Sequence, residues 1–101
     1  MQSALIGKYV VVRTYSAGVH AGILDARDGK EVRLKDSRRI WSWTAANSDS
    51  GALSGVAANG VGPRSKIGNT VSVIELTEAI EIIATTHAAE SAIRAASWSG
   101  K

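Results

Sequence analysis

Residues 38–43 (RRIWSW) place two arginines directly before two of the three tryptophans in a 101-residue chain that contains no phenylalanine. Successive side chains of a strand point to opposite faces, so Arg39, Trp41 and Trp43 would share one face of a strand. Two indole rings about 7 Å apart, twice the rise per residue of a strand, would form a platform on which a base can stack. The alternative is that at least one ring belongs to the core, because tryptophan usually buries most of its apolar area.

The glycine-rich segment of residues 60–68 (GVGPRSKIG) also contains two basic residues. Glycine lets backbone N–H groups approach a phosphate, and the basic side chains add positive charge. The segment lacks the GK[ST] ending of a Walker A motif, and no strand leads straight into it as in a dinucleotide-binding fingerprint. The alternative is a connecting loop without a binding role. The predicted ligand site combines aromatic residues for stacking, basic residues for phosphates and glycines for close approach: Tyr15, Arg39, Trp41, Trp43, Gly60, Gly62, Arg64 and Lys66.

The other reactive residue types do not predict catalysis or a metal site. The chain has no cysteine, which excludes disulfides, thiolate metal sites and cysteine nucleophiles. Its two histidines are His20 and His87; Glu90 stands three residues after His87, but two ligands fall short of a zinc site. No GxSxG elbow surrounds a serine, and no nucleophile, base and orienting group come together. We therefore expect a binding protein, with no enzymatic activity, cofactor or metal.

The charge is mildly basic and unevenly distributed along the chain. A net charge of +3 and a pI of about 9.6 suit an anionic ligand but are weak support for a nucleic-acid-binding protein. Eight of the twelve lysines and arginines lie within residues 1–40. From residue 69 onward the acidic residues are Glu75, Glu78, Glu81 and Glu90, and the basic ones are Arg94 and Lys101. We expect these halves to face each other, within the fold or between subunits, and the glutamates to form a solvated or salt-bridged edge.

The first half of the chain predicts an antiparallel meander. Runs of β-branched and aromatic residues, separated by turn residues, indicate strands over residues 8–15, 19–26, 31–36 and 38–44. The dipeptide Asp28-Gly29 is a strong hairpin signal between the second and third of these.

The second half predicts two helices around a further pair of strands. A short helix over residues 51–58 would end at Asn59-Gly60, with Ser48, Asp49 or Ser50 as its cap. Residues 70–85 are rich in β-branched side chains and predict a strand, split by a bend at Thr77-Glu78. A second helix would begin after Thr85 or Thr86, with a small apolar face formed by Ala89, Ile93 and Ala96.

These elements predict one domain over residues 1–101 of the α+β class: a small, strongly bent antiparallel β-sheet, an SH3-like meander, with a short inserted helix and a C-terminal helix. No apolar run reaches the roughly 18 residues of a membrane span, and no basic segment precedes the apolar start as in a signal peptide. The absence of cysteine fits a reducing cytoplasm. The small apolar faces predict a homo-oligomer, with the ligand pocket at a subunit interface.

Three segments together resemble a family of short bacteriophage proteins of formerly unknown function: residues 11–24 (VVRTYSAGVHAGIL), 38–46 (RRIWSWTAA) and 71–84 (VSVIELTEAIEIIA). The order and spacing of these segments match over most of the chain. The resemblance implies a phage protein with a non-enzymatic role in the cytoplasm of the infected bacterium. Small phage proteins include anti-defence sponges, of the anti-CBASS and anti-Thoeris type, which sequester the cyclic nucleotide signals of bacterial immunity.

The resemblance therefore implies a protein that binds a cyclic nucleotide without cleaving it. Two alternatives remain open at this stage. One is a small nucleic-acid-binding phage protein, which the modest charge makes the weaker choice and which would bind with steep salt dependence. The other is a structural or host-protein-binding phage component, which would bind neither nucleotides nor nucleic acid.

Overall fold

The computed structural model describes residues 3–43, 53–62 and 65–96, which form six strands and two helices. In chain order these are β1 (Tyr9–Thr14), β2 (Val19–Asp28), β3 (Glu31–Ser42), α1 (Leu53–Asn59), β4 (Lys66–Ile67), β5 (Val71–Leu76), β6 (Ala79–Ala84) and α2 (His87–Ala95). The predicted α+β class, with an antiparallel sheet, a short inserted helix and a C-terminal helix, is confirmed. The SH3-like classification of the meander stays a prediction.

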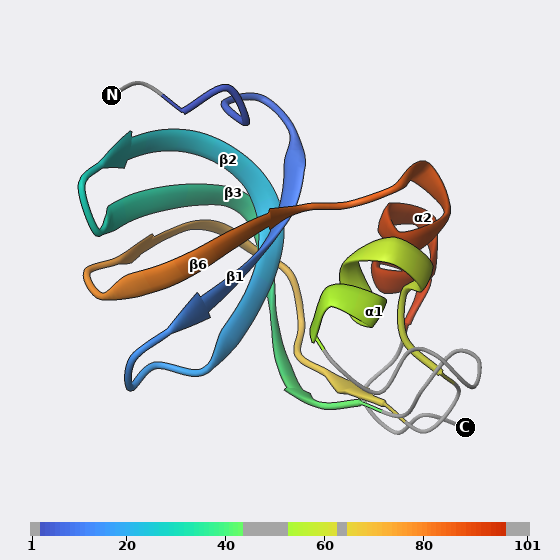
Figure 1. Ribbon diagram of the computed structural model, residues 1–101. Coiled ribbons are helices and arrows are strands. Elements are labelled where there is room, and N and C mark those ends of the chain that lie inside the picture. The colour runs from blue at the N-terminus through green and yellow to red at the C-terminus, as the bar shows by residue number, and fades with distance from the viewer. Residues whose placement is uncertain (1–2, 44–52, 63–64, 97–101) are drawn as a thin grey trace.

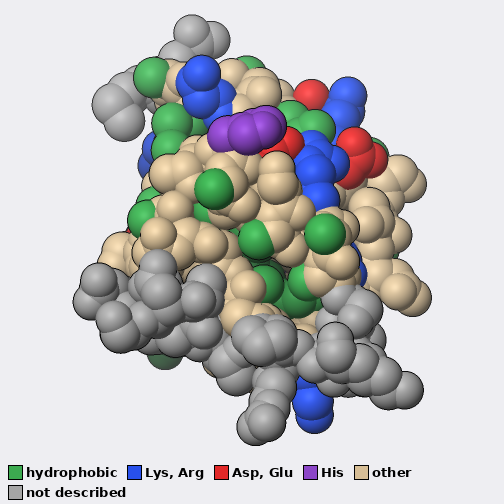
Figure 2. All heavy atoms as spheres, turned by 90° about the vertical axis from the view of Figure 1, so that its right-hand side faces the viewer, with side chains coloured by type: hydrophobic (Ala, Val, Ile, Leu, Met, Phe, Trp, Pro, Cys, Tyr) green, Lys and Arg blue, Asp and Glu red, His purple; other side chains and the backbone are tan. Residues whose placement is uncertain are grey.

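The strands form one antiparallel sheet in the order β4-β3-β2-β1-β6, and β5 also pairs with β3. In Figure 1 the strands curl together at one end of the molecule, while α1 and α2 lie side by side at the other. Figure 2 shows the outer surface of the molecule on the helix side. Where this face is coloured, its hydrophobic side chains are scattered among polar groups and backbone instead of gathered in one patch.

The third and fourth predicted strands are one continuous strand, so the prediction of four strands in residues 8–44 is wrong. β3 runs for 12 residues through Asp36, which adopts a left-handed conformation with φ of 49°. Aspartate tolerates this conformation better than most residues because its short polar side chain can bond locally. The pairing with β2 is irregular nearby, but Lys35 and Ser37 stay in register with Val73 and Val71 of β5. The pairing with β5 therefore keeps β3 continuous across the irregularity at Asp36.

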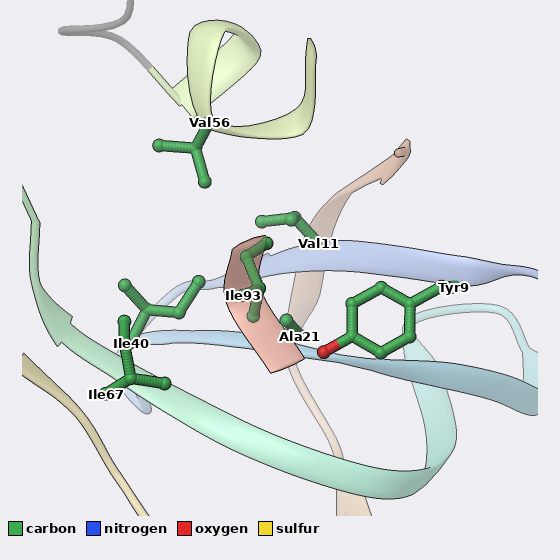
Figure 3. Close-up of a cluster of buried hydrophobic side chains, with 7 residues drawn as sticks. All are labelled: Tyr9, Val11, Ala21, Ile40, Val56, Ile67 and Ile93. Carbon is green, nitrogen blue, oxygen red and sulfur yellow. The ribbon is translucent and has the colours of Figure 1, made fainter. Parts of the chain in front are cut away.

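Both faces of β1 are buried, and this explains its uninterrupted run of valines. One face contributes to a first hydrophobic cluster, shown in Figure 3 and formed by Tyr9, Val11, Ala21, Ile40, Val56, Ile67 and Ile93. The other face contributes to a second cluster, formed by Val10, Val12, Leu24, Val32, Leu34, Leu76 and Ala79. Val56 of α1 and Ile93 of α2 enter the first cluster from the helices, so the helices cover one face of the sheet.

Helix α1 ends where the sequence predicts, at Asn59 followed by Gly60. Gly60 has φ of +85°, and its N–H donates a hydrogen bond to Val56 O at 2.8 Å, a common helix ending for glycine. A Cβ at this position would lie 2.6 Å from the Cβ of Ala92. Gly60 therefore serves both the end of α1 and its close contact with α2.

Helix α2 and the split of the preceding strand also follow the prediction. Thr86 is the N-cap, and its Oγ1 accepts a hydrogen bond from Ala89 N at 3.1 Å. Ala89 and Ile93 are buried, and Ala96 packs against the first cluster, so the predicted apolar face is confirmed. Strands β5 and β6 are separated by Thr77 and Glu78, as expected.

The glutamates of β5 and β6 form surface ion pairs, which confirms the predicted salt-bridged edge. Arg33 Nη2 lies 3.2 Å from Glu75 Oε2, and Arg13 Nε lies 3.0 Å from Glu81 Oε1. The basic first half thus faces the acidic second half within the fold.

Candidate functional site

Arg39 and Trp41 lie together on the face of β3 that points away from the first cluster. Ile40 between them points into that cluster, as strand alternation requires. The Cζ atom of Arg39 lies 3.7 Å from the centroid of the Trp41 ring, a close cation–π contact. The indole ring is 54% exposed although it is one of the largest apolar groups in the chain. An exposed aromatic ring suits a stacking partner.

Trp43 does not extend this platform. Ile40 pairs with Ile67 and Ser42 with Lys66, so two residues of β3 stand against one residue of β4. Such a bulge reverses the alternation of side chains beyond it. Trp43 is accordingly half-buried and packs against the first cluster. The expected pair of neighbouring rings is not formed, and the alternative of a ring that serves the core describes Trp43.

Arg39 and Trp41 line a pocket of about 260 Å³ at the junction of β2, β3 and β5. The other lining residues come from these strands and from the segment between β4 and β5: His20, Ser37, Gly68, Asn69, Val71 and Ile74. Val71 is exposed beside the pocket, and so is Val73, the residue two further along β5. The pocket therefore combines an aromatic ring and aliphatic side chains with a few polar groups, as small-ligand sites usually do.

Two polar side chains of this pocket, Arg39 and Ser37, have no hydrogen-bond partner among the described residues. Arg39 is half-buried, and its guanidinium group neither donates a hydrogen bond nor forms an ion pair in the described part of the chain. Ser37 is 1% exposed, and its Oγ has no hydrogen-bond partner there. Buried polar groups are nearly always paired, so unpaired donors beside a pocket indicate that the partner is a ligand or solvent.

Arg39 differs in this respect from every other arginine that the structure describes. Each of the others donates to an acceptor of the protein, either a carboxylate or a backbone carbonyl: Arg13, Arg27, Arg33, Arg38 and Arg94. A planar guanidinium with uncommitted N–H groups fits a carboxylate or phosphate.

His20 forms part of the pocket wall opposite Arg39 in the ladder between β2 and β3. Its Nε2 lies 2.9 Å from Ala17 O, and because a carbonyl can only accept, Nε2 carries the proton. Burial lowers the pKa of His20 below its usual value, and the positive charge of Arg39 lowers it further, against the opposing effect of the bond to Ala17. His20 is therefore neutral at physiological pH and leaves Arg39 as the charged group of the pocket wall.

The structure does not bring the remaining predicted residues to this pocket. Tyr15 is 77% exposed in the turn after β1, where its N–H donates to Glu78 O at 2.9 Å. Gly60 lies against α2, as described above, and does not line the pocket. Gly62 O accepts a hydrogen bond from Ser65 Oγ at 2.9 Å within its own loop.

Lys66 is exposed on β4, where it pairs with Ser42, and it does not line the pocket. Arg64 lies outside the described residues. Of the eight predicted residues, the pocket thus unites Arg39 and Trp41.

Sequence reasoning missed the other residues of the pocket. Ser37 stands two residues before Arg39, so strand alternation would have placed it on the same face once β3 was read as continuous. His20 becomes a neighbour only through the register between β2 and β3. Asn69 and Val71 have no local signal, because the pairing of β5 with β3 brings them there.

Within the described residues, no group of three or more histidine, aspartate or glutamate side chains could hold a metal ion. None of the described helices is long and apolar enough to cross a membrane. A comparison with curated proteins finds no significant match. The family model for a domain of unknown function, DUF6948, matches residues 7–93, and the chain therefore belongs to the DUF6948 family.

Proposed function

We propose that this protein binds a nucleotide in the pocket of Arg39 and Trp41 and sequesters a cyclic nucleotide signal without cleaving it. One observation carries the proposal: a half-buried guanidinium with no acceptor in the described residues lies 3.7 Å from the centroid of a half-exposed indole ring. A ligand that satisfies both groups must offer anionic oxygens and a flat ring, and a nucleotide offers both.

The two groups would divide the recognition between them. A base stacked on the exposed part of Trp41 would contribute about 1–3 kcal/mol. The N–H groups of Arg39 would donate charge-assisted hydrogen bonds to a phosphate, which are shorter and stronger than neutral ones. The Ser37 hydroxyl, buried without a partner in the described residues, supplies a further polar group that a base edge or an ordered water would satisfy.

The size of the pocket supports a shared binding site. At about 260 Å³ it is smaller than the roughly 300–1,000 Å³ of most small-molecule sites. One nucleotide unit fits this description better than a whole cyclic di- or trinucleotide. Holding such a signal well below micromolar concentration requires roughly 10–12 kcal/mol of binding free energy, more than one stacked base supplies. We therefore propose a homo-oligomer in which a second copy of the chain holds the rest of the ligand.

The resemblance to phage proteins extends the proposal to the biological setting. On that basis we place the protein in the cytoplasm of an infected bacterium, as an anti-defence sponge. The curved meander of β1 to β3, which we class as SH3-like within this proposal, would present the ligand face opposite the helices.

The proposal is tested by calorimetry of the full chain against cyclic di- and trinucleotides. We expect tight binding of at least one of them, and recovery of that ligand chemically intact after heat denaturation of the protein. Arg39→Ala and Trp41→Ala should each weaken binding by roughly tenfold or more, because each removes an interaction of at least about 1.4 kcal/mol. Arg13→Ala is the matched control, since it removes the same charge from a surface ion pair outside the pocket.

Three outcomes would overturn the proposal. Binding to none of the cyclic nucleotides would remove it, and so would full affinity in the Arg39→Ala/Trp41→Ala double variant. Recovery of a cleaved ligand would make the protein an enzyme. Binding of oligonucleotides with a steep salt dependence, without binding of cyclic nucleotides, would favour the nucleic-acid-binding alternative.

A further inference from the structure

The turn between β1 and β2 is held in place by hydrogen bonds to its own side chains and backbone. Thr14 Oγ1 accepts a bond from Ala17 N and donates one to Gly18 O, both at 2.8 Å. Thr14 N also donates to Gly18 O at 3.0 Å, and His20 Nε2 donates to Ala17 O at 2.9 Å. The backbone of this turn is therefore fixed where it meets the pocket.

Gly18 contacts the guanidinium group of Arg39 at this turn. A Cβ at residue 18 would lie 2.9 Å from Nη2, 3.1 Å from Nε and 3.2 Å from Cζ of Arg39. Nη2 and Nε are the nearest atoms, so a side chain at residue 18 would displace the Arg39 guanidinium from its place beside the turn. The same group lies 3.7 Å from the centroid of the Trp41 ring.

We infer that Gly18 is a positioning residue of this site: because it has no side chain, it leaves the space in which the Arg39 guanidinium lies beside the turn and against Trp41. The inference rests on the proposed function for the role of the site.

The requirement at Gly18 differs from that at other glycines of similar conformation. Gly7 and Gly29 have φ of +86° and +60°, and a Cβ at either would meet nothing within 4 Å. Glycine is needed at those positions for the backbone conformation only. Gly18 has the same conformational requirement, with φ of +85°, and also the contact with Arg39. Gly7 therefore provides a control that is matched in backbone strain and lacks the contact.

The experiment compares Gly18→Ala with Gly7→Ala in the full chain. In ¹H–¹⁵N spectra, Gly18→Ala should shift the indole N–H signal of Trp41 and the Nε–H signal of Arg39, whereas Gly7→Ala should leave both unchanged. With adenosine monophosphate as the probe, Gly18→Ala should weaken binding roughly tenfold, the loss expected for one charge-assisted hydrogen bond, and Gly7→Ala should not.

If Gly18→Ala does not fold, the Gly18→Ala/Arg39→Ala double variant decides the question. Removing the Arg39 side chain should restore folding to the level of Gly7→Ala, because it removes the clash that the new Cβ creates. A double variant that still fails to fold would overturn the inference, and so would unshifted Arg39 and Trp41 signals in Gly18→Ala. Shifted signals with unchanged affinity would overturn the role in binding. If the wild-type protein binds neither the probe nor cyclic nucleotides, the proposed function fails, while the spectra still decide whether Gly18 positions Arg39.

Discussion

Arg38 and Arg39 are neighbours in the sequence, but they lie on opposite faces of β3 and have different partners. Arg38 is 8% exposed and donates to four backbone carbonyls, those of Gly68, Ile67, Ile93 and Arg94. Arg39 faces the pocket and donates to no acceptor in the described residues. The same type of side chain thus holds the fold together on one face of β3 and is available to bind a ligand on the other.

The helix explains the difference. The last carbonyls of α2 carry partial negative charge, so a cation is stabilised there without a carboxylate. Arg38 Nη1 donates to Ile93 O at 2.8 Å and to Arg94 O at 3.2 Å. Neither of the two described helices covers the side of β3 that bears Arg39, and the N–H groups of Arg39 keep their capacity for a ligand.

Gly68 connects the two sides of β3. Its carbonyl accepts a hydrogen bond from Arg38 Nε at 2.8 Å, and its N–H donates to Arg39 O at 2.8 Å. A Cβ on Gly68 would lie 3.4 Å from Trp41 Nε1. Arg38 therefore supports the wall of the pocket from behind, although its own side chain faces the helices.

The largest effect that separates the two arginines should be on stability. Arg38→Ala should lower the free energy of unfolding by roughly 3 kcal/mol or more, because it removes the donor of four hydrogen bonds to backbone carbonyls, two of them buried. Arg39→Ala should lower it by less than about 1 kcal/mol, because its principal contact is with a half-exposed ring. Urea denaturation of both variants measures the difference. Equal losses would contradict the assignment of the two arginines to structure and to ligand.

A second contrast lies between Gly60 on the helix side and the control Gly7. Gly60→Ala should cost roughly 2–3 kcal/mol of unfolding free energy, since it combines left-handed strain with a clash against Ala92. Gly7→Ala should cost about 1 kcal/mol, because only the backbone strain applies. Ligand affinity should be unchanged in a folded Gly60→Ala protein. A tenfold loss of affinity would show that Gly60 belongs to the binding site.

The two tryptophans extend the same comparison to the aromatic residues. Trp43→Ala should lower the free energy of unfolding by roughly 2 kcal/mol, about half of what a fully buried ring costs, because Trp43 is half-buried against the first cluster. Trp41→Ala should change it by less than about 1 kcal/mol, because the ring is mostly exposed, and should affect ligand affinity instead. Thermal or urea denaturation measures the effect on stability, and calorimetry measures the effect on ligand affinity. A larger stability loss for Trp41→Ala would reverse the assignment.

What the sequence predicts correctly depends on neighbours in the chain. Thr86 as a cap and the bend at Thr77-Glu78 involve contacts within a few residues, and both are confirmed. The continuity of β3 through Asp36 depends on pairing with β5, more than 30 positions away. Local propensities alone would end a strand there, so the sequence predicted two strands.

The same difference between local contacts and long-range pairing applies to the candidate site. Alternation along β3 correctly places Arg39 and Trp41 on one face. The position of Trp43 depends on a bulge against β4, a strand of two residues that the sequence does not predict. The role of Gly60 depends on contact with α2, which is distant in the chain. Pockets are assembled by such long-range pairings, so alternation along one strand predicted two residues of this pocket, and the others follow only from the fold.

The smallest expected effect concerns pH, because each face of the sheet buries one titratable ring. On the helix side burial raises the pKa of Tyr9, so this residue stays neutral through the physiological range. On the pocket side burial lowers the pKa of His20 below the ordinary 6.5. At pH values between the lowered pKa of the folded state and the ordinary pKa of the unfolded chain, the unfolded chain binds more protons than the folded one. The free energy of unfolding therefore falls as the pH falls through this range.

The contribution of His20 should therefore be complete above pH 6.5 and decline as the pH falls through the lower pKa of the folded state. Wild-type protein should lose more unfolding free energy between pH 7.5 and pH 5 than His20→Gln, which cannot titrate. His87→Gln, at an exposed position outside the pocket, controls for loss of a histidine as such. Protonation at Nδ1 would also place a second positive charge beside Arg39, while Nε2 would keep its hydrogen bond to Ala17 O. Identical pH dependence in wild type and His20→Gln would show that the buried imidazole does not couple the pocket side of the sheet to stability.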